Sequence, residues 1–282
     1  MGPRADSEPP VLVTVDDGVA VVALNRPHQL NALHGRAIAL LSQTYERLDR
    51  DDDVKVIVLT GTGHAFCAGA NLQRAGGAFQ APRDHSNYRS SPPRPLAFQL
   101  HKPVIAAING HAIGLGMTLA MHCDLRIIAD DAKWGIVQVR RGVVPDAISH
   151  WTLTKAVGMA KAAEVLLTGR LFTGSEAVGL GVASRSMPAE EVLPAALELA
   201  HEMATECSPM SMGMSKRILW AAADGDLALI DDMESEAHRY LMGRPDSLEG
   251  GSAVHEKRKP NWDSQVSRDW PKTGVFAEGD QL

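Results

Sequence analysis

Two separated stretches of this chain place small residues next to the predicted start of a helix. Residues 65–72 read Ala-Phe-Cys-Ala-Gly-Ala-Asn-Leu, and residues 109–118 read Asn-Gly-His-Ala-Ile-Gly-Leu-Gly-Met-Thr. The first backbone N–H groups of a helix have no intrahelical partner, so they can point at an anion. We expect each stretch to supply one N–H group to the same anionic oxygen.

A carboxylate beside such an oxygen site could move a proton, and Asp146 is the candidate. His150 follows one helical turn later and could pair with Asp146 to activate water. In the alternative interpretation, Asp146 only caps a helix that begins near Ala147, which would keep its pKa low. A useful base would instead need apolar burial to raise that pKa. The sequence leaves both roles open.

The elements that position these residues alternate between strand and helix. The patterns predict a hairpin, a helix with Asn31 as its N-cap, and three buried strands. Their expected ranges are 11–15 and 19–24 for the hairpin, about 32–48 for the helix, and 54–59, 104–108 and 125–129 for the strands. Such alternation predicts a layered α/β core with crossover connections.

Composition excludes several classes of protein. The 282 residues are 45% apolar, which is enough for a substantial core, and the formal charge of −6 provides no basic field for nucleic acid or an anionic membrane. Three widely separated cysteines favour neither disulfides nor a zinc site, so we expect a reducing, cytoplasmic location. The polar residues 1–10 and the interrupted apolar stretch 103–129 predict neither a signal peptide nor a membrane span.

Competing motifs are incomplete. Gly114 and Gly116 could open a dinucleotide fingerprint, but Leu119 occupies the place of its third glycine. The three aspartates at 51–53 lack the glycine and distal glutamate of a calcium loop, which favours a solvated turn. His111 and His122 have no partners at ligand spacing, so packing or hydrogen-bonding roles are favoured and no metal is expected.

Several motifs together resemble the crotonase (enoyl-CoA hydratase/isomerase) superfamily. They are the two stretches above, Pro-Val-Ile-Ala-Ala-Ile at 103–108, an R-P-x-x-x-N-A-L motif at 26–33, L-T-G at 167–169, and E-K-R-x-P-x-F-like residues at 256–262. The resemblance spans roughly residues 11–262. It implies the crotonase β-β-α spiral for the α/β core.

The resemblance also implies an organisation of the chain. Residues 11–200 would form the acyl-CoA-binding spiral core and residues 201–265 a helical trimerisation region, which contains a Met-rich segment. Residues 1–10 and 266–282 would be flexible tails. A homotrimer or a dimer of trimers is expected, with substrate choice in the Gly- and Pro-rich stretch 76–95.

In this family two N–H groups hold the enolate oxygen of an acyl-CoA, and the matching positions are Ala70 and Leu115. The implied substrate is a coenzyme A thioester, with no further cofactor. The positions implied for CoA contacts are Arg26, Ala68, Lys257 and Lys259.

Both glutamates of the family's hydratases are replaced, by Thr118 and Gln138. Neither side chain has a useful pKa, which argues against two-glutamate hydration. Thr118 could instead bind a water molecule, and Gln138 could orient a substrate carbonyl.

Asp146 takes a place that resembles the position of the acid/base glutamate in peroxisomal-type Δ3,Δ2-enoyl-CoA isomerases. It also matches the nucleophilic aspartate of 4-chlorobenzoyl-CoA dehalogenase, but that enzyme's histidine and tryptophan would fall on Ser91 and Gln138. Isomerase-like proton transfer is therefore favoured. Two alternatives stay open: a hydrolase or atypical hydratase that uses Asp146 with His150 or Asp84, and a non-catalytic acyl-CoA-binding protein.

Overall fold

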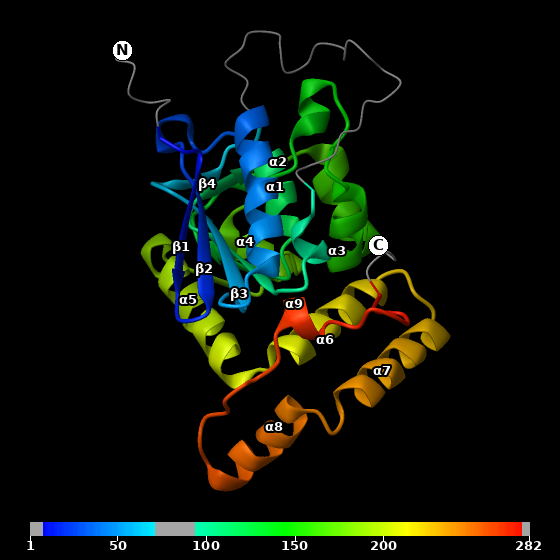
Figure 1. Ribbon diagram of the computed structural model, residues 1–282. Coiled ribbons are helices and arrows are strands. Elements are labelled where there is room, and N and C mark those ends of the chain that lie inside the picture. The colour runs from blue at the N-terminus through cyan, green and yellow to red at the C-terminus, as the bar shows by residue number, and fades with distance from the viewer. Residues whose placement is uncertain (1–7, 71–93, 278–282) are drawn as a thin grey trace.

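Two β-sheets form the framework of the fold in the computed structural model, which describes residues 8–70 and 94–277 (Figure 1). The larger sheet has six strands in the order β1-β2-β3-β5-β7-β9, and the smaller has three in the order β4-β6-β8. β1 and β2 are antiparallel, and the other pairings are parallel. The strands are β1 (Val11–Asp16), β2 (Val19–Leu24), β3 (Val56–Gly61), β4 (Ala65–Cys67), β5 (Val104–Ile108), β6 (His111–Ile113), β7 (Leu125–Ala129), β8 (Trp134–Gly135) and β9 (Arg185–Met187).

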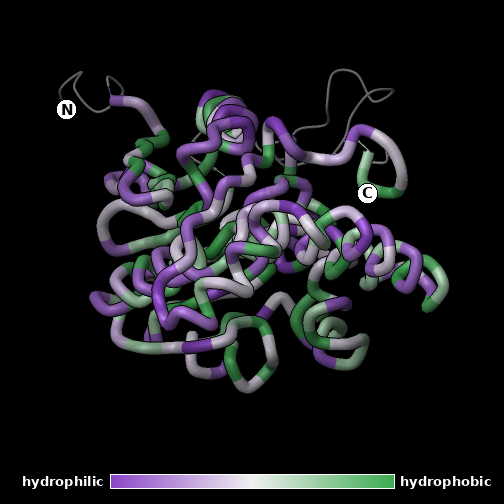
Figure 2. The backbone as a smooth tube through the Cα atoms, turned by 60° about the horizontal axis from the view of Figure 1, so that its bottom comes forward, coloured by the Kyte–Doolittle hydropathy of each residue, from purple (hydrophilic) through white to green (hydrophobic). Residues whose placement is uncertain are grey.

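The helices cover the sheets and continue beyond them. They are α1 (Gly35–Arg50), α2 (Leu115–Met121), α3 (Ser149–Thr168), α4 (Gly174–Leu180), α5 (Ala189–Glu206), α6 (Pro209–Ala221), α7 (Leu227–Leu241), α8 (Pro245–Glu256) and α9 (Val266–Asp269), with short 3-10 turns at Pro27–Gln29, Ala97–Gln99 and Gln138–Arg141. α5 packs on β2, β3, β5 and β7, while β4 of the smaller sheet contacts β3 and β5. Polar and apolar segments alternate along the helical coils in Figure 2, as expected where one helix face is buried. Within the part of the chain that is described, no helix is long and apolar enough to span a bilayer.

The predicted α/β class and the hairpin are confirmed. β3 and β5 are buried along their whole length, which agrees with the apolar residues that fill β5 and the first four positions of β3. The predicted N-cap was wrong. Asn31 has a φ of 56°, accepts a 2.8 Å hydrogen bond from Arg26 N, and donates to carbonyl oxygens at residues 62 and 65, so it ties two loops together. The cap of α1 is His34, whose Nδ1 accepts from the N–H of residue 37 at 3.1 Å.

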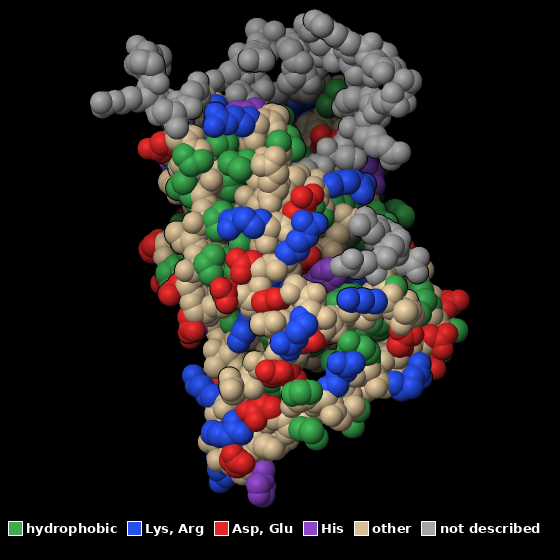
Figure 3. All heavy atoms as spheres, viewed as in Figure 1, with side chains coloured by type: hydrophobic (Ala, Val, Ile, Leu, Met, Phe, Trp, Pro, Cys, Tyr) green, Lys and Arg blue, Asp and Glu red, His purple; other side chains and the backbone are tan. Residues whose placement is uncertain are grey.

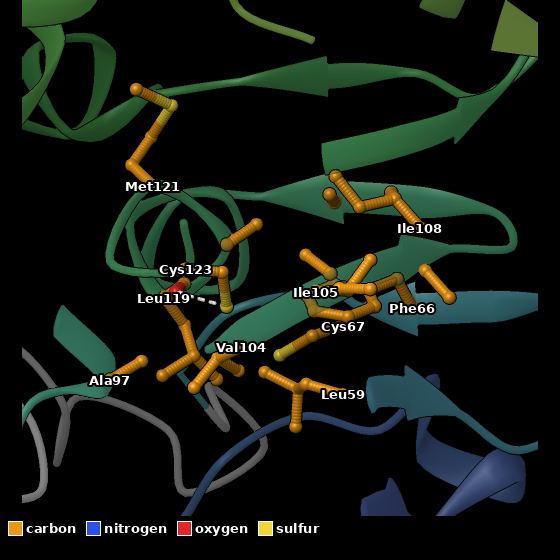
Figure 4. Close-up of a cluster of buried hydrophobic side chains, with 14 of the residues drawn as sticks. Leu59, Phe66, Cys67, Ala97, Val104, Ile105, Ile108, Leu119, Met121 and Cys123 are labelled. Atoms are coloured by element: carbon orange, nitrogen blue, oxygen red, sulfur yellow. Dashed lines mark hydrogen bonds between the residues drawn. The ribbon is translucent and has the colours of Figure 1, made fainter. Parts of the chain in front are cut away.

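One continuous hydrophobic core lies beneath the two stretches singled out in the sequence. Cys67 from β4 and Leu119 from α2 point into it, beside Leu59, Val104 and Ile105 (Figure 4). Burial raises the pKa of the Cys67 thiol to about 12, so this cysteine packs as a small apolar group. The core thus supports β4 and α2 from the same side.

The C-terminal helices have a smaller core of their own. Met210 and Met214 of α6 pack there with Val266, Trp270 and Phe276. Residues 266–277 are therefore held against α6 and α7, in contrast to the flexible tail expected from residue 266. The apolar side chains in this segment explain the difference, because burying them favours the packed state.

A buried lysine joins the C-terminal helices to the larger sheet. Lys216 of α6 places its Nζ 2.8 Å from Asp124 Oδ2 and donates to the carbonyl oxygens of Ala97 and Lys102, at 2.7 and 2.8 Å. On the face shown in Figure 3, Lys/Arg and Asp/Glu side chains are intermixed, which fits the near-balanced composition.

Candidate active site

The two small-residue stretches meet because β4 and β6 are adjacent parallel strands. Ala65 pairs with His111, and Cys67 pairs with Ala112. Parallel strands end at the same edge of a sheet, so the segment after Cys67 and the segment after β6 leave the sheet side by side. The first continues to Ala70, and the second continues into α2.

Two glycines allow these segments to touch. Gly69 has a φ of 92°, and a Cβ atom there would lie 2.6 Å from Ile113 O and 3.4 Å from Leu115 N. A Cβ atom on Gly116 would lie 2.1 Å from Cys67 O. Larger residues at either position would push the two turns apart.

The close approach leaves two backbone donors available. Leu33 N donates to Gly69 O at 2.7 Å, and this pairing does not use the N–H of Ala70. Leu115 is the first residue of α2, so its N–H has no partner within the helix. Among the described residues, neither of these N–H groups has a hydrogen-bond acceptor. The side chain of Leu115 packs against the main core.

Gln138 connects Asp146 to the turn that precedes Leu115. Gln138 Nε2 donates to Asp146 Oδ1 at 3.0 Å. A Cβ atom on Gly114 would lie 3.8 Å from the amide atoms of Gln138, so that amide rests on the turn that leads into α2. One side chain therefore bridges the turn and the carboxylate.

The environment of Asp146 suits a base better than an exposed position would. Partial burial raises the pKa of its carboxyl group, and the hydrogen bond from Gln138 opposes that shift. Gln138 Oε1 is buried and has no hydrogen-bond partner in the described part of the chain. The amide thus orients toward Asp146 while its own oxygen is left without a donor.

Asp146 is not a helix cap. α3 begins at Ser149, and its N-cap is Ile148, which makes no side-chain cap hydrogen bond. Ala147 and Ile148, which connect Asp146 to Ser149, have φ values of 54° and 53°. The interpretation of Asp146 as the cap of a helix starting near Ala147 was therefore wrong, because this left-handed turn separates the carboxylate from α3.

Comparison with known proteins shows the family of this chain. Residues 14–265 match the sequence profile of the family described as enoyl-CoA hydratase/isomerase. The chain belongs to the enoyl-CoA hydratase/isomerase family. It is 33% identical over 252 residues to a probable enoyl-CoA hydratase of Mycobacterium bovis, covering 89% of this chain and 97% of the relative. It is 32% identical over 257 residues, with the same two coverages, to the 1,2-epoxyphenylacetyl-CoA isomerase of Escherichia coli.

Solved structures show the same fold. A probable enoyl-CoA hydratase/isomerase from Mycobacterium abscessus matches with a TM-score of 0.87 and 46% identity, covering 90% of this chain and 99% of that one. An enoyl-CoA hydratase from Bacillus anthracis matches with a TM-score of 0.83 and 30% identity, covering 90% and 98%. The crotonase-type fold expected from the motifs is confirmed.

Among the described residues of this family member, neither Thr118 nor His150 is hydrogen-bonded to Asp146. Thr118 is fully buried, and its Oγ1 donates to Leu115 O at 3.1 Å, so the hydroxyl is engaged within α2. His150 is exposed on the first turn of α3, and no hydrogen bond or ion pair joins it to Asp146 in residues 94–277. Asp84 and Ser91 lie outside the described residues.

The predicted CoA contacts do not gather around one site within a single chain. Arg26 is 8% exposed and donates from Nη1 to Ala32 O at 3.1 Å. Ala68 N donates to Leu30 O at 2.9 Å and helps to shape the first turn. Lys257 and Lys259 follow α8, at the opposite end of the molecule from β4 and the N-terminal end of α1 (Figure 1).

The described residues contain no cluster of three or more His, Cys, Asp and Glu side chains that could hold a metal ion.

The sequence patterns missed one contact at the site: His122 Nε2 lies 2.8 Å from the carbonyl oxygen of Ala147, the residue that follows Asp146. No spacing rule could have revealed it, because the two residues belong to different elements.

Proposed function

We propose that this family member isomerises an enoyl-CoA thioester, with Asp146 as the acid/base. The ionised carboxylate removes a proton from C2 of a 3-enoyl-CoA, and the C2–H electron pair forms a dienolate. The thioester oxygen takes the negative charge and accepts hydrogen bonds from the N–H groups of Ala70 and Leu115. Asp146 then returns the proton to C4, and the double bond moves to C2–C3. No water, metal or further cofactor is consumed.

The position of Asp146 is the observation that carries this proposal. It is a partly buried carboxyl group with a raised pKa, connected through Gln138 to the turn that bears Leu115 N–H. A base whose pKa lies nearer to the working pH removes a proton more effectively. A single carboxylate that serves both carbons suits isomerisation.

Hydration by two carboxylates fits the site less well. The positions that correspond to the hydratase glutamates carry Thr118 and Gln138, and both hold hydrogen bonds to protein atoms. Neither can take a proton from water near neutral pH. A hydrolase or an atypical hydratase therefore remains the alternative enzyme, and an acyl-CoA-binding protein is the alternative without catalysis.

The deciding experiment supplies a trans-3-enoyl-CoA and a trans-2-enoyl-CoA to the purified protein and follows the products by NMR in D2O. The wild-type protein is compared with Asp146→Asn and with Asp232→Asn, an exposed aspartate of α7 as control. We expect conversion of the 3-enoyl substrate, a loss of about 10²–10⁴-fold in Asp146→Asn, and no change in the control.

Other outcomes contradict the proposal in distinct ways. Hydration of the 2-enoyl substrate that is unaffected by Asp146→Asn would exclude Asp146 as the general base. Thioester hydrolysis would favour the hydrolase. Binding of acyl-CoA with no turnover of any thioester would favour a binding protein.

We also propose that the chain works as a homotrimer or a dimer of trimers. The support is a set of exposed apolar side chains on α6, α7 and α8 and their connections, which a monomer would leave in water. They include Leu219, Leu227, Met242, Leu248 and Val254. A neighbouring copy could then bring Lys257 and Lys259 to the CoA phosphates, which are suitable partners for lysine.

A further inference from the structure

His122 lies directly after α2 and is completely buried. Its Nε2 atom is 2.8 Å from Ala147 O. Burial lowers the pKa of His122 to about 4, so the ring is neutral near pH 7. A carbonyl oxygen only accepts hydrogen bonds, which assigns the single ring proton to Nε2.

The carbonyl that His122 holds belongs to a turn that few residues adopt. Ala147 and Ile148 both have positive φ values, of 54° and 53°. A non-glycine residue persists in this conformation only where surrounding contacts hold it. Ala147 is held by the donation from His122, and the 3.1 Å hydrogen bond from Ser149 N to Asp146 O closes the turn. The carbonyl oxygen of Ile148 accepts from the first turn of α3.

A ring contact restricts the orientation of His122. Phe98 meets the imidazole edge to face, with ring centroids 6.0 Å apart and an interplanar angle of 76°. Within the described residues, Nδ1 has no hydrogen-bond partner, so no competing bond draws the ring away from Ala147. Its donor is therefore aimed at the turn next to Asp146.

We infer that His122 is a positioning residue that holds the Asp146 turn against α2, and this inference rests on the acid/base role proposed for Asp146. α2 begins with Leu115, the residue proposed to donate its N–H to the substrate oxygen, and it is followed directly by His122. The same short, buried helix therefore sets where the oxyanion donor and the proton-transfer group stand relative to each other. Imidazole chemistry is not required, since His122 acts only as a fixed donor.

A matched pair of variants tests the donor. Glutamine can place an N–H near the position of the imidazole Nε2, whereas methionine has the same chain length and no donor. We expect His122→Met to lower kcat on the 3-enoyl-CoA about tenfold with little change in KM, and His122→Gln to restore most of that loss. The pH at which kcat/KM falls on the acid side should move downward in His122→Met, because a looser turn exposes the Asp146 carboxyl to water.

A second readout does not depend on turnover. The carboxyl resonance of Asp146, assigned by its absence in Asp146→Asn, is titrated by ¹³C NMR in wild type, His122→Met and His122→Gln. We expect the pKa of Asp146 to move toward its ordinary value in His122→Met alone. If this shift appears while the wild-type protein has no isomerase activity, the positioning role stands and the proposed function fails.

Unchanged kcat, pH profile and carboxyl pKa in a folded His122→Met protein with only a lower Tm would overturn the inference. If His122→Met does not fold, His122→Asn replaces it, because the shorter asparagine side chain cannot reach Ala147 O from the position of His122. It should lower kcat about threefold and shift the carboxyl pKa in the same direction. No change in either quantity would again overturn the inference.

Discussion

The hydrogen bond between Gln138 and Asp146 sets two opposing influences on one carboxyl group. Burial raises the pKa of Asp146, and the amide donor lowers it by favouring the ionised form. A glutamate in place of Gln138 would add a second negative charge next to the first. The amide instead supports the ionised base without competing for its proton.

Removing that amide should therefore shift the pH dependence of catalysis. In Gln138→Met the Asp146 carboxylate loses the hydrogen bond that lowers its pKa. The pKa therefore rises, and the carboxylate becomes protonated at a higher pH. We expect the acid limb of kcat/KM to move upward in pH. Gln265→Met, at an exposed position before α9, is the control. A downward shift or no shift would contradict the assignment of Asp146 as the base.

Asp146 should also cost the fold some stability. Its pKa in the folded protein lies above its value in the unfolded chain, so the folded state disfavours the ionised form. The resulting loss of stability is present at pH values above the folded-state pKa, and it disappears as the pH falls. We expect Asp146→Asn to raise Tm slightly at pH 7 while it lowers isomerisation about 10²–10⁴-fold. The difference in Tm should shrink at pH 4. A lower Tm at pH 7 would indicate that the carboxylate is structural.

At the scale of elements, the close approach of the β4 turn to α2 depends on Gly69. A Cβ atom there would meet Ile113 O at 2.6 Å, and the φ of 92° disfavours any other residue. We expect Gly69→Ala to displace one oxyanion donor and lower kcat by about 10²–10³-fold. Gly179 of α4 has open space around its Cβ position, so Gly179→Ala should leave kcat unchanged. Equal kcat values for the two variants would contradict the oxyanion site.

Removing the buried ion pair between Lys216 of α6 and Asp124 should lower the stability of the fold. Lys216→Met would leave Asp124 buried without its cation, and the side chains are only 5% and 11% exposed. We expect the free energy of unfolding to fall by about 3 kcal/mol. Lys155 pairs with Asp224 at the surface, and Lys155→Met should cost less than about 1 kcal/mol. Denaturant titration of both variants measures the difference, and similar costs would show that the buried pair is not a structural link.

At the scale of the whole molecule, the proposed assembly predicts a defined mass. Light scattering after size-exclusion chromatography should give three or six chains for the wild type. Leu227→Glu and Val254→Glu, at side chains 86% and 81% exposed, should shift the protein toward the monomer, whereas Val15→Glu on β1 should not. A monomeric wild type would exclude the trimer and, with it, the supply of Lys257 and Lys259 by a neighbouring copy.

The sequence alone was sufficient for the features that depend on local pattern. The predicted strands 104–108 and 125–129 have the observed bounds of β5 and β7. β5 is a continuous apolar run, as a strand buried on both faces requires, and β7 is mostly apolar apart from Arg126. The turn Asp-Asp-Gly marks the hairpin of β1 and β2. The motifs also identify the family, because the glycines that let β4 and α2 approach one another are visible as sequence.

Only the tertiary structure decided the features that depend on partners distant in the chain. Asn31 resembles an N-cap locally, but its amide finds carbonyl oxygens at residues 62 and 65. Trp270 belongs to a terminal stretch of unremarkable composition, yet it is buried against α6. The pKa of Asp146 and the donor on His122 arise from burial and from contacts between elements, which are created when the chain folds and are absent from any local pattern of residues.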